Sequence, residues 1–488
     1  NFSTKYVVYW PSPKGKHPNI YGHLCEKFQS SKIKEFQREI GMLPKAKLHE
    51  SDINPIFRCL YDNYKGLPSP DLHVAFFDIE TDFDPQRGFS KPEDPFTAIT
   101  AVTVYLDWLD QLVTLALPPR TLSLDQATDL VADIPNVFLF DDEGQMLTTL
   151  LDLIDDADVV SGWNSEGYDV PYLINRTCQV LSKDDTRKFC LMGQLPKPRE
   201  YERFGKVEMT YDLIGRIHMD YLQLYKKYNY ESRHSYKLDF IGEMEVGENK
   251  VPYEGTLDQL YNKDWEKFLE YNRQDTMLLV KIHNKLKFLD LANALAHENT
   301  VLLPTVMGSV AMIEMAIMNE AHERGLVVPD KQRKEVSDDE QTAAGAYVAT
   351  PKKGLHDYVG AIDINSLYPS AIRACNMGPE TIIGQLRPTM TDRLIQERMA
   401  RGQSFAAAWE GLFASLEYTA VMDRERGTEI TIDWSTGEES VHSAADIWPM
   451  IFDSNRPWAI TANGTIFTYD KEAVIPGLLK RWYAERKD

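Results

Sequence analysis

The chain has 488 residues, of which 43% are hydrophobic and 26% are charged, and its formal net charge is −21. This length favours about two to four domains, and no apolar run approaches the roughly 18 residues that cross a membrane. The five cysteines are scattered and never form a Cys-x-x-Cys pair, which argues against a disulfide framework or a zinc ribbon and fits a reducing cytoplasm.

Residues 1–72 form the first predicted domain. They contain an apolar stretch at 6–10 and basic helical text at 32–38, and they end in the proline-containing linker 67–70. We expect residues from about 290 to 335 to complete this N-terminal domain.

Residues 73–289 form the second predicted domain. Apolar runs typical of strands lie at 74–77, 98–106 and 137–140, and helical text follows at 144–153. Strands that alternate with helices predict an α/β layer with a mixed sheet.

Four further elements are expected downstream. A short strand is predicted at 158–161, and a hairpin at 199–210, where the residue types alternate on both sides of a Phe-Gly turn. An amphipathic helix is predicted at 264–289, and another at 307–324 that ends at Gly325.

The charged stretch 331–340 connects to a third predicted domain, residues 340–470. This domain has helical text at about 393–408, followed by a region rich in strand-forming residues. A last helix is predicted at 475–487, within a final segment that comprises residues 471–488.

Acidic residues recur on three elements of the second domain. Asp78 and Glu80 are two positions apart at a strand end, so both side chains lie on one face, close enough to share a cation. Asp169 follows a strand at a strand-to-helix turn, and Tyr271 and Asp275 lie one helical turn apart. Taken singly, these residues also fit a solvated strand end, a helix cap, or a surface Asp beside a half-buried Tyr.

Together, the four carboxylates of Asp78, Glu80, Asp169 and Asp275 match the needs of a site for phosphodiester cleavage with two metal ions. Two Mg²⁺ or Mn²⁺ ions would clamp the attacking and leaving oxygens. The Tyr271 hydroxyl could orient the attacking water.

The order of these motifs resembles Exo I, Exo II and Exo III of DEDDy-type 3′–5′ exonucleases. Those motifs read D-x-E, N-x-x-x-(F/Y)-D and Y-x-x-x-D, and the chain matches each of them with Asp78-Ile-Glu80, Asn164 to Asp169 and Tyr271 to Asp275. The resemblance implies a ribonuclease-H-like fold and a single-stranded 3′ end as the substrate.

A second acidic motif is the segment Asp363-Ile-Asn-Ser-Leu-Tyr-Pro-Ser370. We expect it to follow a strand at 358–362 and to lead into a helix at 370–375. On its own it could be a strand-to-helix turn that contains Tyr-Pro. It resembles motif A of B-family DNA polymerases, D-x-x-S-L-Y-P-S, at every fixed position.

That resemblance implies particular roles in nucleotide incorporation. Asp363 would ligate both polymerase metals, the Ile364 carbonyl would add an oxygen, and the Tyr368 ring would exclude a 2′-hydroxyl. Backbone amides of three residues would hold the triphosphate of a dNTP: Ser366, Leu367 and Tyr368. Arg486 would also meet the triphosphate, although its segment equally fits a solvated basic helix end.

The family's K-x-x-x-N-S-x-Y-G and D-T-D-S segments do not occur in the chain. We therefore interpret it as the N-terminal portion of a family B DNA polymerase, similar to the T-even-type phage replicative group. Residues 340–470 would be the first part of the palm and 471–488 the start of the fingers. Incorporation is expected to need a second segment or chain that carries the missing motifs, and the chain begins with Asn1, as it would inside a longer product.

The expected partners are primer-template DNA, single-stranded DNA and dNTPs in the cytoplasm of a host cell, with a sliding clamp as a partner that the resemblance allows and no membrane. The net charge of −21 counts mildly against DNA binding, so we expect local patches of Lys and Arg to contact the DNA phosphates. Two alternatives stay open: a stand-alone 3′–5′ exonuclease with a relic polymerase segment, and a non-catalytic DNA-binding assembly subunit. The intact nuclease acids argue against the second.

Overall fold

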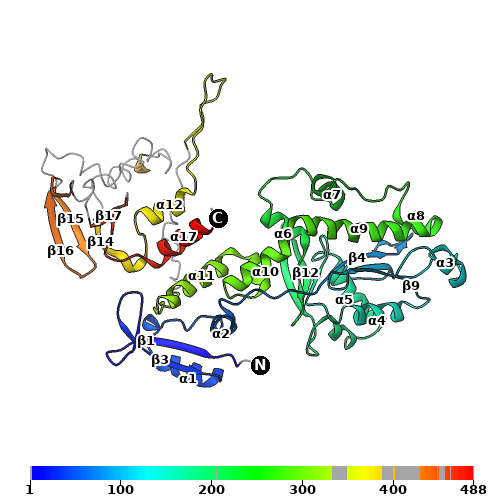
Figure 1. Ribbon diagram of the computed structural model, residues 1–488, viewed down its shortest axis with the longest axis horizontal. Helices are drawn as coiled ribbons and strands as arrows, with labels where there is room; N and C mark the ends of the chain where they lie inside the picture. The colour runs from blue at the N-terminus through cyan, green and yellow to red at the C-terminus, as the bar shows by residue number, and fades with distance from the viewer. Residues whose placement is uncertain are drawn as a thin grey trace. The chain divides into compact units, whose positions relative to one another are not determined.

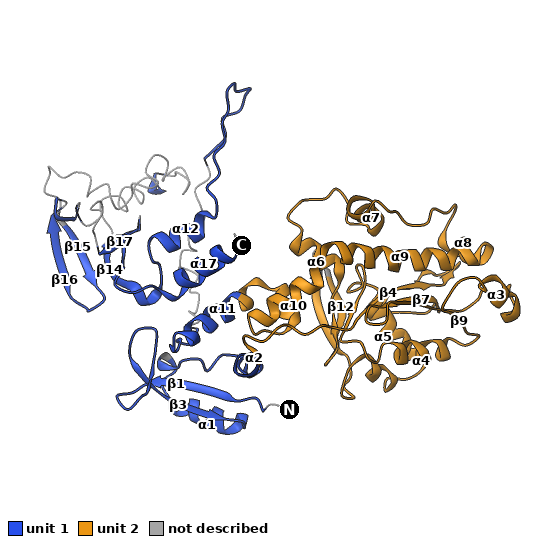
Figure 2. Cartoon of the chain, in the orientation of Figure 1, with its two compact units in different colours: residues 1–63, 313–488 blue, residues 64–312 orange. Residues whose placement is uncertain are grey.

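The structure is a computed structural model. It describes residues 3–203, 206–331, 349–386, 399–401, 429–443, 445–447, 449, 457–461 and 463–486. The chain divides into two compact units, residues 64–312, and residues 1–63 together with 313–488 (Figures 1 and 2). Several sheets and many helices occur in the described parts, so the predicted multidomain α/β class is confirmed. No helix in these parts is long and apolar enough to span a membrane.

A six-stranded mixed sheet forms the centre of unit 64–312. Its strand order is β13-β10-β4-β7-β8-β9, in which β4 runs parallel to β10 and antiparallel to β7. The bounds of the strands are as follows: β4 (Val74–Thr81), β7 (Ile99–Leu106), β8 (Gln111–Ala116), β9 (Val137–Leu139), β10 (Val159–Ser161) and β13 (Ile217–His218).

Four of these strands were predicted, whereas β8 and the two-residue strand β13 were missed. The strand β8 is the longer of the two. It follows β7 through a tight turn that contains neither glycine nor proline, the residues that usually mark turns. Asp110 takes the left-handed conformation there, with φ of 52°. A turn that depends on an aspartate in this conformation is hard to recognise from a single sequence, so the hairpin of β7 and β8 was not predicted.

Helices cover both faces of the sheet (Figure 1). One core lies against α4 (Glu143–Leu153) and α5 (Asp169–Val180), and it contains Ala75, Phe77 and Ile79 of β4. The other core lies beneath α9 (Trp265–Leu286), with α3 (Leu124–Leu130) and α8 (Leu257–Lys263) beside it. Because side chains alternate along a strand, the β4 residues at positions 76, 78 and 80 face α9.

The other helices and strands of this unit largely follow the predictions. The hairpin is β11 (Lys197–Arg203) paired with β12 (Lys206–Asp212), although its Phe-Gly turn lies outside the described residues. The predicted helix 264–289 is shorter, because Lys287 has φ of 55° and separates α9 from α10 (Phe288–Glu298). The remaining helices are α6 (Tyr221–Tyr228) and α7 (Leu238–Val246).

The unit formed by residues 1–63 and 313–488 contains two separate sheets among its described residues. A three-stranded sheet has the order β1-β3-β2, with β1 (Tyr6–Pro11), β2 (His17–Pro18) and β3 (Leu24–Ser30). A five-stranded antiparallel sheet has the order β16-β15-β14-β18-β17, with β14 (Ile382–Leu386), β15 (Glu429–Trp434), β16 (Glu439–Ser443), β17 (Trp458–Ile460) and β18 (Thr465–Thr468). The helices are α1 (Ile33–Met42), α2 (Pro55–Tyr64), α11 (Ser309–Glu323), α12 (Leu367–Ala374) and α17 (Val474–Glu485).

Two predicted segments of this unit lie outside the described residues. The charged connection 331–340 is described only at Lys331, and most of the helical text at 393–408 is likewise not described. By contrast, α1, α11 and α17 confirm the helices predicted near residues 32–38, 307–324 and 475–487. Gly325 follows α11 with φ of 70°, as the predicted helix end requires.

Candidate active site

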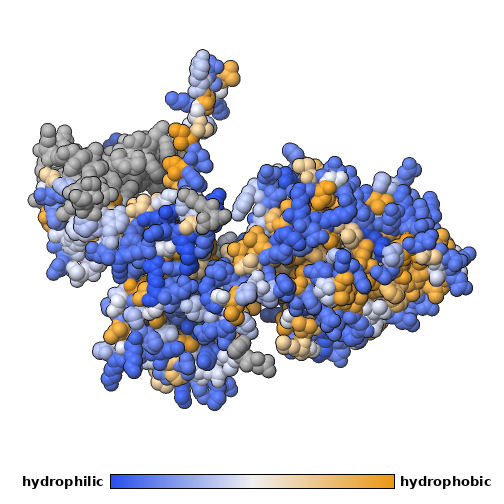
Figure 3. All heavy atoms as spheres, in the orientation of Figure 1, coloured by the Kyte–Doolittle hydropathy of each residue, from blue (hydrophilic) through white to orange (hydrophobic). Residues whose placement is uncertain are grey.

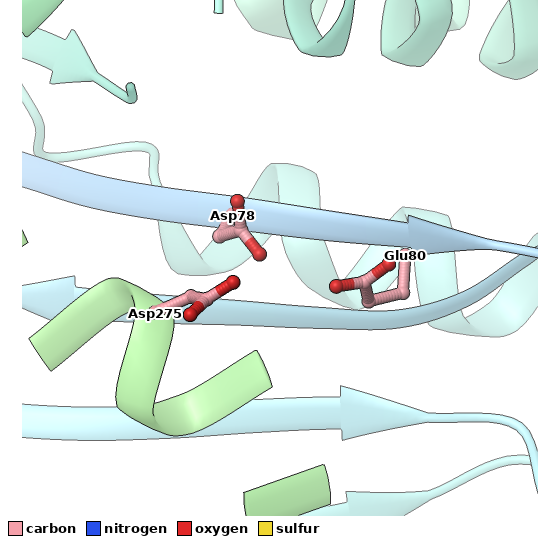
Figure 4. A group of neighbouring side chains, drawn as sticks. All are labelled: Asp78, Glu80 and Asp275. Atoms are coloured by element: carbon pink, nitrogen blue, oxygen red, sulfur yellow. The ribbon is translucent and has the colours of Figure 1, made fainter. Parts of the chain in front are cut away.

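The strand β4 and the helix α9 bring together three of the four acids that the sequence singled out. Asp78 and Glu80 project from the α9 side of β4, and Asp275 projects from α9 toward them (Figure 4). One carboxylate oxygen of each residue lies within 4.8 Å of the others. Within the described residues this is the one group of at least three metal-ligating side chains that meets that distance.

Asp169 is the first residue of α5 and is buried. The N-cap residue of α5 is Tyr168, whose side chain makes no capping hydrogen bond. Hydrogen bonds from the backbone of Asp169 itself and of Ile79 stabilise the Asp169 carboxylate. The charge of Asp169 raises the pKa of both Asp78 and Glu80, which places it within electrostatic range of them. Asp169 is thus a neighbour of the three acids, not a member of the tight group.

Burial and mutual repulsion make these carboxyl groups weak acids. Burial raises the pKa of Glu80 to about 8, and the charge of Asp275 adds to the rise while Lys250 opposes it. Burial also raises the pKa of Asp169 to about 7. The pKa of Asp78 is well above its ordinary range because of burial first and then the charges of Glu80 and Asp275.

Lys250 is a site residue that the sequence did not predict. Its ammonium donates hydrogen bonds to Asp275 Oδ2 at 2.5 Å and to the Tyr271 hydroxyl at 2.9 Å. It lies between α7 and α8 in a segment without regular structure, so neither periodicity nor a motif marks it. Lys250 is followed directly by Val-Pro-Tyr, and such a stretch is too common to mark a functional lysine.

Tyr271 is buried beside Asp275, and the ring of Tyr253 packs edge-on against it at a centroid distance of 5.3 Å. Its oxygen accepts the hydrogen bond from Lys250, so the hydroxyl proton is left to be donated elsewhere. Burial is the largest cause that raises its pKa, so the phenol stays protonated at neutral pH.

The donor set fits a hard divalent cation. Carboxylate oxygens are the ligands that Mg²⁺ and Mn²⁺ prefer in proteins. Asp275 Oδ1 is buried and has no hydrogen-bond partner among the described residues. A buried, unpartnered oxygen on a carboxylate that lies close to two further carboxylates is costly without a cation. Asp78, Glu80 and Asp275 could therefore hold a metal, with Asp169 close by.

The structure contradicts the predicted strand at 358–362. These residues form no strand, and Tyr358 and Ile362 have relative exposures of 105% and 96%. A strand requires a hydrogen-bonded neighbour, and none of the described strands pairs with this segment. The helix predicted at 370–375 instead begins at Leu367, after Ser366 in the left-handed conformation.

The residues of the motif A resemblance lie mostly in water. Asp363, Ile364 and Tyr368 are exposed, and Asp363 has no acidic partner in the described groups of metal-ligating residues. Arg486 lies at the end of α17 and is exposed too. α12 packs beside α17, where the Arg373 guanidinium lies 4.7 Å from the centre of the Tyr483 ring.

Comparison with known proteins places the chain in a family. The model of the exonuclease domain of DNA polymerase family B matches residues 28–241, and the model of DNA polymerase family B matches residues 304–488. The chain belongs to DNA polymerase family B.

Its relatives include polymerases of phages and archaea. It is 30% identical to the DNA-directed DNA polymerase of Enterobacteria phage T4, over 79% of this chain and 45% of that protein. It is 25% identical to the enzyme of the same name from Escherichia phage RB69, over 76% of this chain and 43% of that protein. DNA polymerase 1 of Pyrococcus abyssi is 24% identical, over 51% of this chain and 32% of that protein. The chain therefore spans less than half the length of the relatives that it matches.

Proposed function

We propose that this chain forms the 3′–5′ proofreading exonuclease and the first part of the palm of a replicative DNA polymerase. The observation that carries the nuclease is the convergence of Asp78, Glu80 and Asp275 beside the unpartnered Oδ1 of Asp275. The names of the phage relatives support a role in DNA replication. Part of the proposal is that the chain acts in the cytoplasm of a host cell, with a sliding clamp as a further partner.

In this proposal, Asp78, Glu80, Asp169 and Asp275 hold two Mg²⁺ or Mn²⁺ ions. Cations of this kind, when bound, stabilise charge on the attacking and leaving oxygens of a phosphodiester. The Tyr271 hydroxyl orients the attacking water, because its proton is not used in the hydrogen bond from Lys250.

The palm segment would act only after assembly with further palm and fingers residues. Asp363 and the Ile364 carbonyl would hold the polymerase metals, and Arg486 would meet the triphosphate of a dNTP. Backbone amides would hold its phosphates at three positions: Ser366, Leu367 and Tyr368. A second acid is needed to hold both cations, so another segment or chain would supply it.

Exposed apolar side chains support that requirement. Leu355, Val359 and Ile362 have relative exposures of 97%, 76% and 96%, and Figure 3 shows hydrophobic atoms along this segment. Apolar side chains in water next to an unpaired backbone favour pairing with another strand. We propose that the remaining palm strands cover them.

A strand-degradation assay tests the nuclease. A single-stranded oligonucleotide labelled at its 5′ end should be shortened from its 3′ end in Mg²⁺ or Mn²⁺. The pair Asp78→Ala/Glu80→Ala should lower the rate by several orders of magnitude, whereas Asp290→Asn, an exposed carboxylate of the same unit, should leave it unchanged. Cleavage at the wild-type rate by the double variant would contradict the assignment.

A primer-extension assay separates the polymerase from a stand-alone exonuclease. Residues 1–488 alone should not extend a primer, and extension should appear when a segment with the missing motifs is added. Asp363→Ala should then abolish extension and leave strand degradation intact. Extension by residues 1–488 that survives Asp363→Ala would refute the palm assignment, and no extension with any added segment would favour the stand-alone exonuclease.

A further inference from the structure

A row of buried polar side chains crosses the sheet beneath α9. The strand register pairs Asp78 of β4 with Thr103 of β7, and Thr103 with Thr114 of β8. Asn272 of α9 lies over this row, and the two threonines and Asn272 all have relative exposures of 0%. Polar groups that are buried so completely cost free energy unless every one is hydrogen-bonded.

Each member of this polar row is hydrogen-bonded to the next. Arg273 Nη1 donates to Thr114 Oγ1 at 2.9 Å, and the hydroxyl oxygens of Thr114 and Thr103 are 3.0 Å apart. Thr103 Oγ1 donates to Asn272 Oδ1 at 2.5 Å, and Asn272 Nδ2 donates to Asp78 Oδ2 at 2.8 Å. The row therefore leads from a guanidinium to a carboxylate of the candidate active site without a gap.

An ionised Asp78 fixes one direction for the whole row. A carboxylate can only accept, so Asn272 presents its NH₂ group to Asp78 and its oxygen to Thr103. Thr103 uses its single proton on that oxygen, so the hydrogen bond between the two hydroxyls is donated by Thr114. Thr114 in turn accepts from the Arg273 guanidinium, which can only donate.

We propose that Asn272 is a positioning residue for Asp78, and that the row from Arg273 through Thr114 and Thr103 holds its amide in the orientation that donates to Asp78. This inference rests on the proposed nuclease function. The donated hydrogen bond engages Oδ2 and leaves the other oxygen of Asp78 for a cation. Partners of this kind that orient a metal ligand typically matter about 10- to 100-fold for metal affinity or activity.

The position of Asn272 also couples the two elements of the site. Asn272 lies three residues before Asp275 on α9, while its hydrogen bond reaches Asp78 on β4. A hydrogen bond from one ligand-bearing element to a ligand on the other keeps their separation fixed. Because Asn272, Thr103 and Thr114 are fully buried, we place the role of the polar row in the geometry of the acids.

Three threonine variants test the proposal. Thr103→Val keeps the shape and removes the donor to Asn272, Thr103→Ser restores a hydroxyl, and Thr177→Val removes another buried hydroxyl of this unit. Thr177 Oγ1 has no hydrogen-bond partner among the described residues, so its loss is a matched control for burial. The measurements are the dissociation constant for Mn²⁺, kcat and KM for a single-stranded oligonucleotide, and the melting temperature.

We expect Thr103→Val to weaken Mn²⁺ binding about tenfold and to lower kcat with little change in KM. Thr103→Ser and Thr177→Val should stay within about twofold of wild type. A purely structural role would lower the melting temperature of Thr103→Val and leave its Mn²⁺ affinity unchanged. Wild-type Mn²⁺ affinity and kcat in Thr103→Val would overturn the proposal.

A second measurement is independent of metal binding and of nuclease activity. In protein labelled with ¹⁵N-asparagine, the side-chain NH₂ protons of Asn272 should exchange slowly with solvent in the wild type and in Thr103→Ser. They should exchange much faster in Thr103→Val. If the wild type binds no Mn²⁺, the proposed nuclease fails, whereas unprotected Asn272 protons in the wild type would refute the polar row itself.

Discussion

Removal of divalent metal should make the stability of unit 64–312 fall as the pH rises. Burial and neighbouring charges raise the pKa of Glu80 from 4.5 to about 8 and that of Asp169 from 3.8 to about 7. The folded state therefore retains protons that the unfolded state has already lost. This stabilisation is complete below about pH 4 and disappears as the pH rises through the folded values, toward pH 8.

The size of the effect follows from the displacement of the pKa. For Glu80 alone, a rise of the pKa from 4.5 to about 8 would correspond to about 5 kcal/mol of folding stability if the side chain were fully shielded from solvent. Because Glu80 is half-buried, screening by solvent reduces this to about 2–3 kcal/mol. For a unit of this length, each kcal/mol moves the melting temperature by about 2–4 °C, so the fall between pH 5 and pH 8.5 should be about 5–10 °C.

Calorimetry in the presence of EDTA measures the fall directly. The double variant Glu80→Gln/Asp169→Asn keeps the shapes of both side chains and cannot titrate, so its melting temperature should depend much less on pH. Saturating Mn²⁺ should restore the wild type at pH 8.5, because a ligand that binds only the folded state stabilises it. Equal pH dependence in wild type and double variant would refute the reasoning.

Two further variants each remove one positively charged side chain. Lys250→Met leaves the acids without their ammonium, so the metal-free protein should lose about 1–3 kcal/mol at pH 8 and regain most of it with Mn²⁺, as thermal denaturation would show; an equal loss with Mn²⁺ would contradict this. In the other unit, Arg58→Met leaves the buried Glu50 carboxylate without its guanidinium and should cost about 3–5 kcal/mol in denaturant unfolding, against less than about 1 kcal/mol for Lys32→Met in an exposed pair. Similar losses for both would show that burial does not govern these ion pairs.

The sequence predicts those parts of the site that local geometry governs. Alternation along a strand puts Asp78 and Glu80 on one face, and the structure brings both to Asp275. Lys250 could not be predicted, because its position depends on how an irregular segment returns over α9. The polar row could not be predicted either, since it depends on the register of three strands, which a single sequence does not specify.

The prediction at 358–362 failed for a different reason. The apolar run before Asp363 has the composition of a buried strand, but a strand exists only where a neighbouring strand completes its hydrogen bonds. The described residues provide no such neighbour, so the same side chains lie exposed. An apolar composition therefore shows that a segment is suited to a buried strand. Whether the strand forms depends on a neighbouring strand that pairs with it.

The charges of the site suggest how cations and DNA bind together. When ionised, the carboxylates of Asp78, Glu80, Asp169 and Asp275 carry four negative charges, and Lys250 returns one positive charge. One divalent cation would leave a single negative charge, and a second would leave a single positive charge. A phosphodiester, with one negative charge, then completes the balance.

The second cation and the 3′ end of DNA should therefore bind cooperatively. Without DNA, a second divalent cation would leave a net positive charge in a largely buried site, which is unfavourable. Equilibrium dialysis of Mn²⁺ should show one ion bound tightly to the free protein and a second that binds tightly only with an oligonucleotide whose 3′-terminal linkage resists hydrolysis. Two ions of equal affinity in the absence of DNA would contradict this charge balance, and Lys250→Met should allow the second ion to bind more tightly without DNA, because the site then lacks one positive charge.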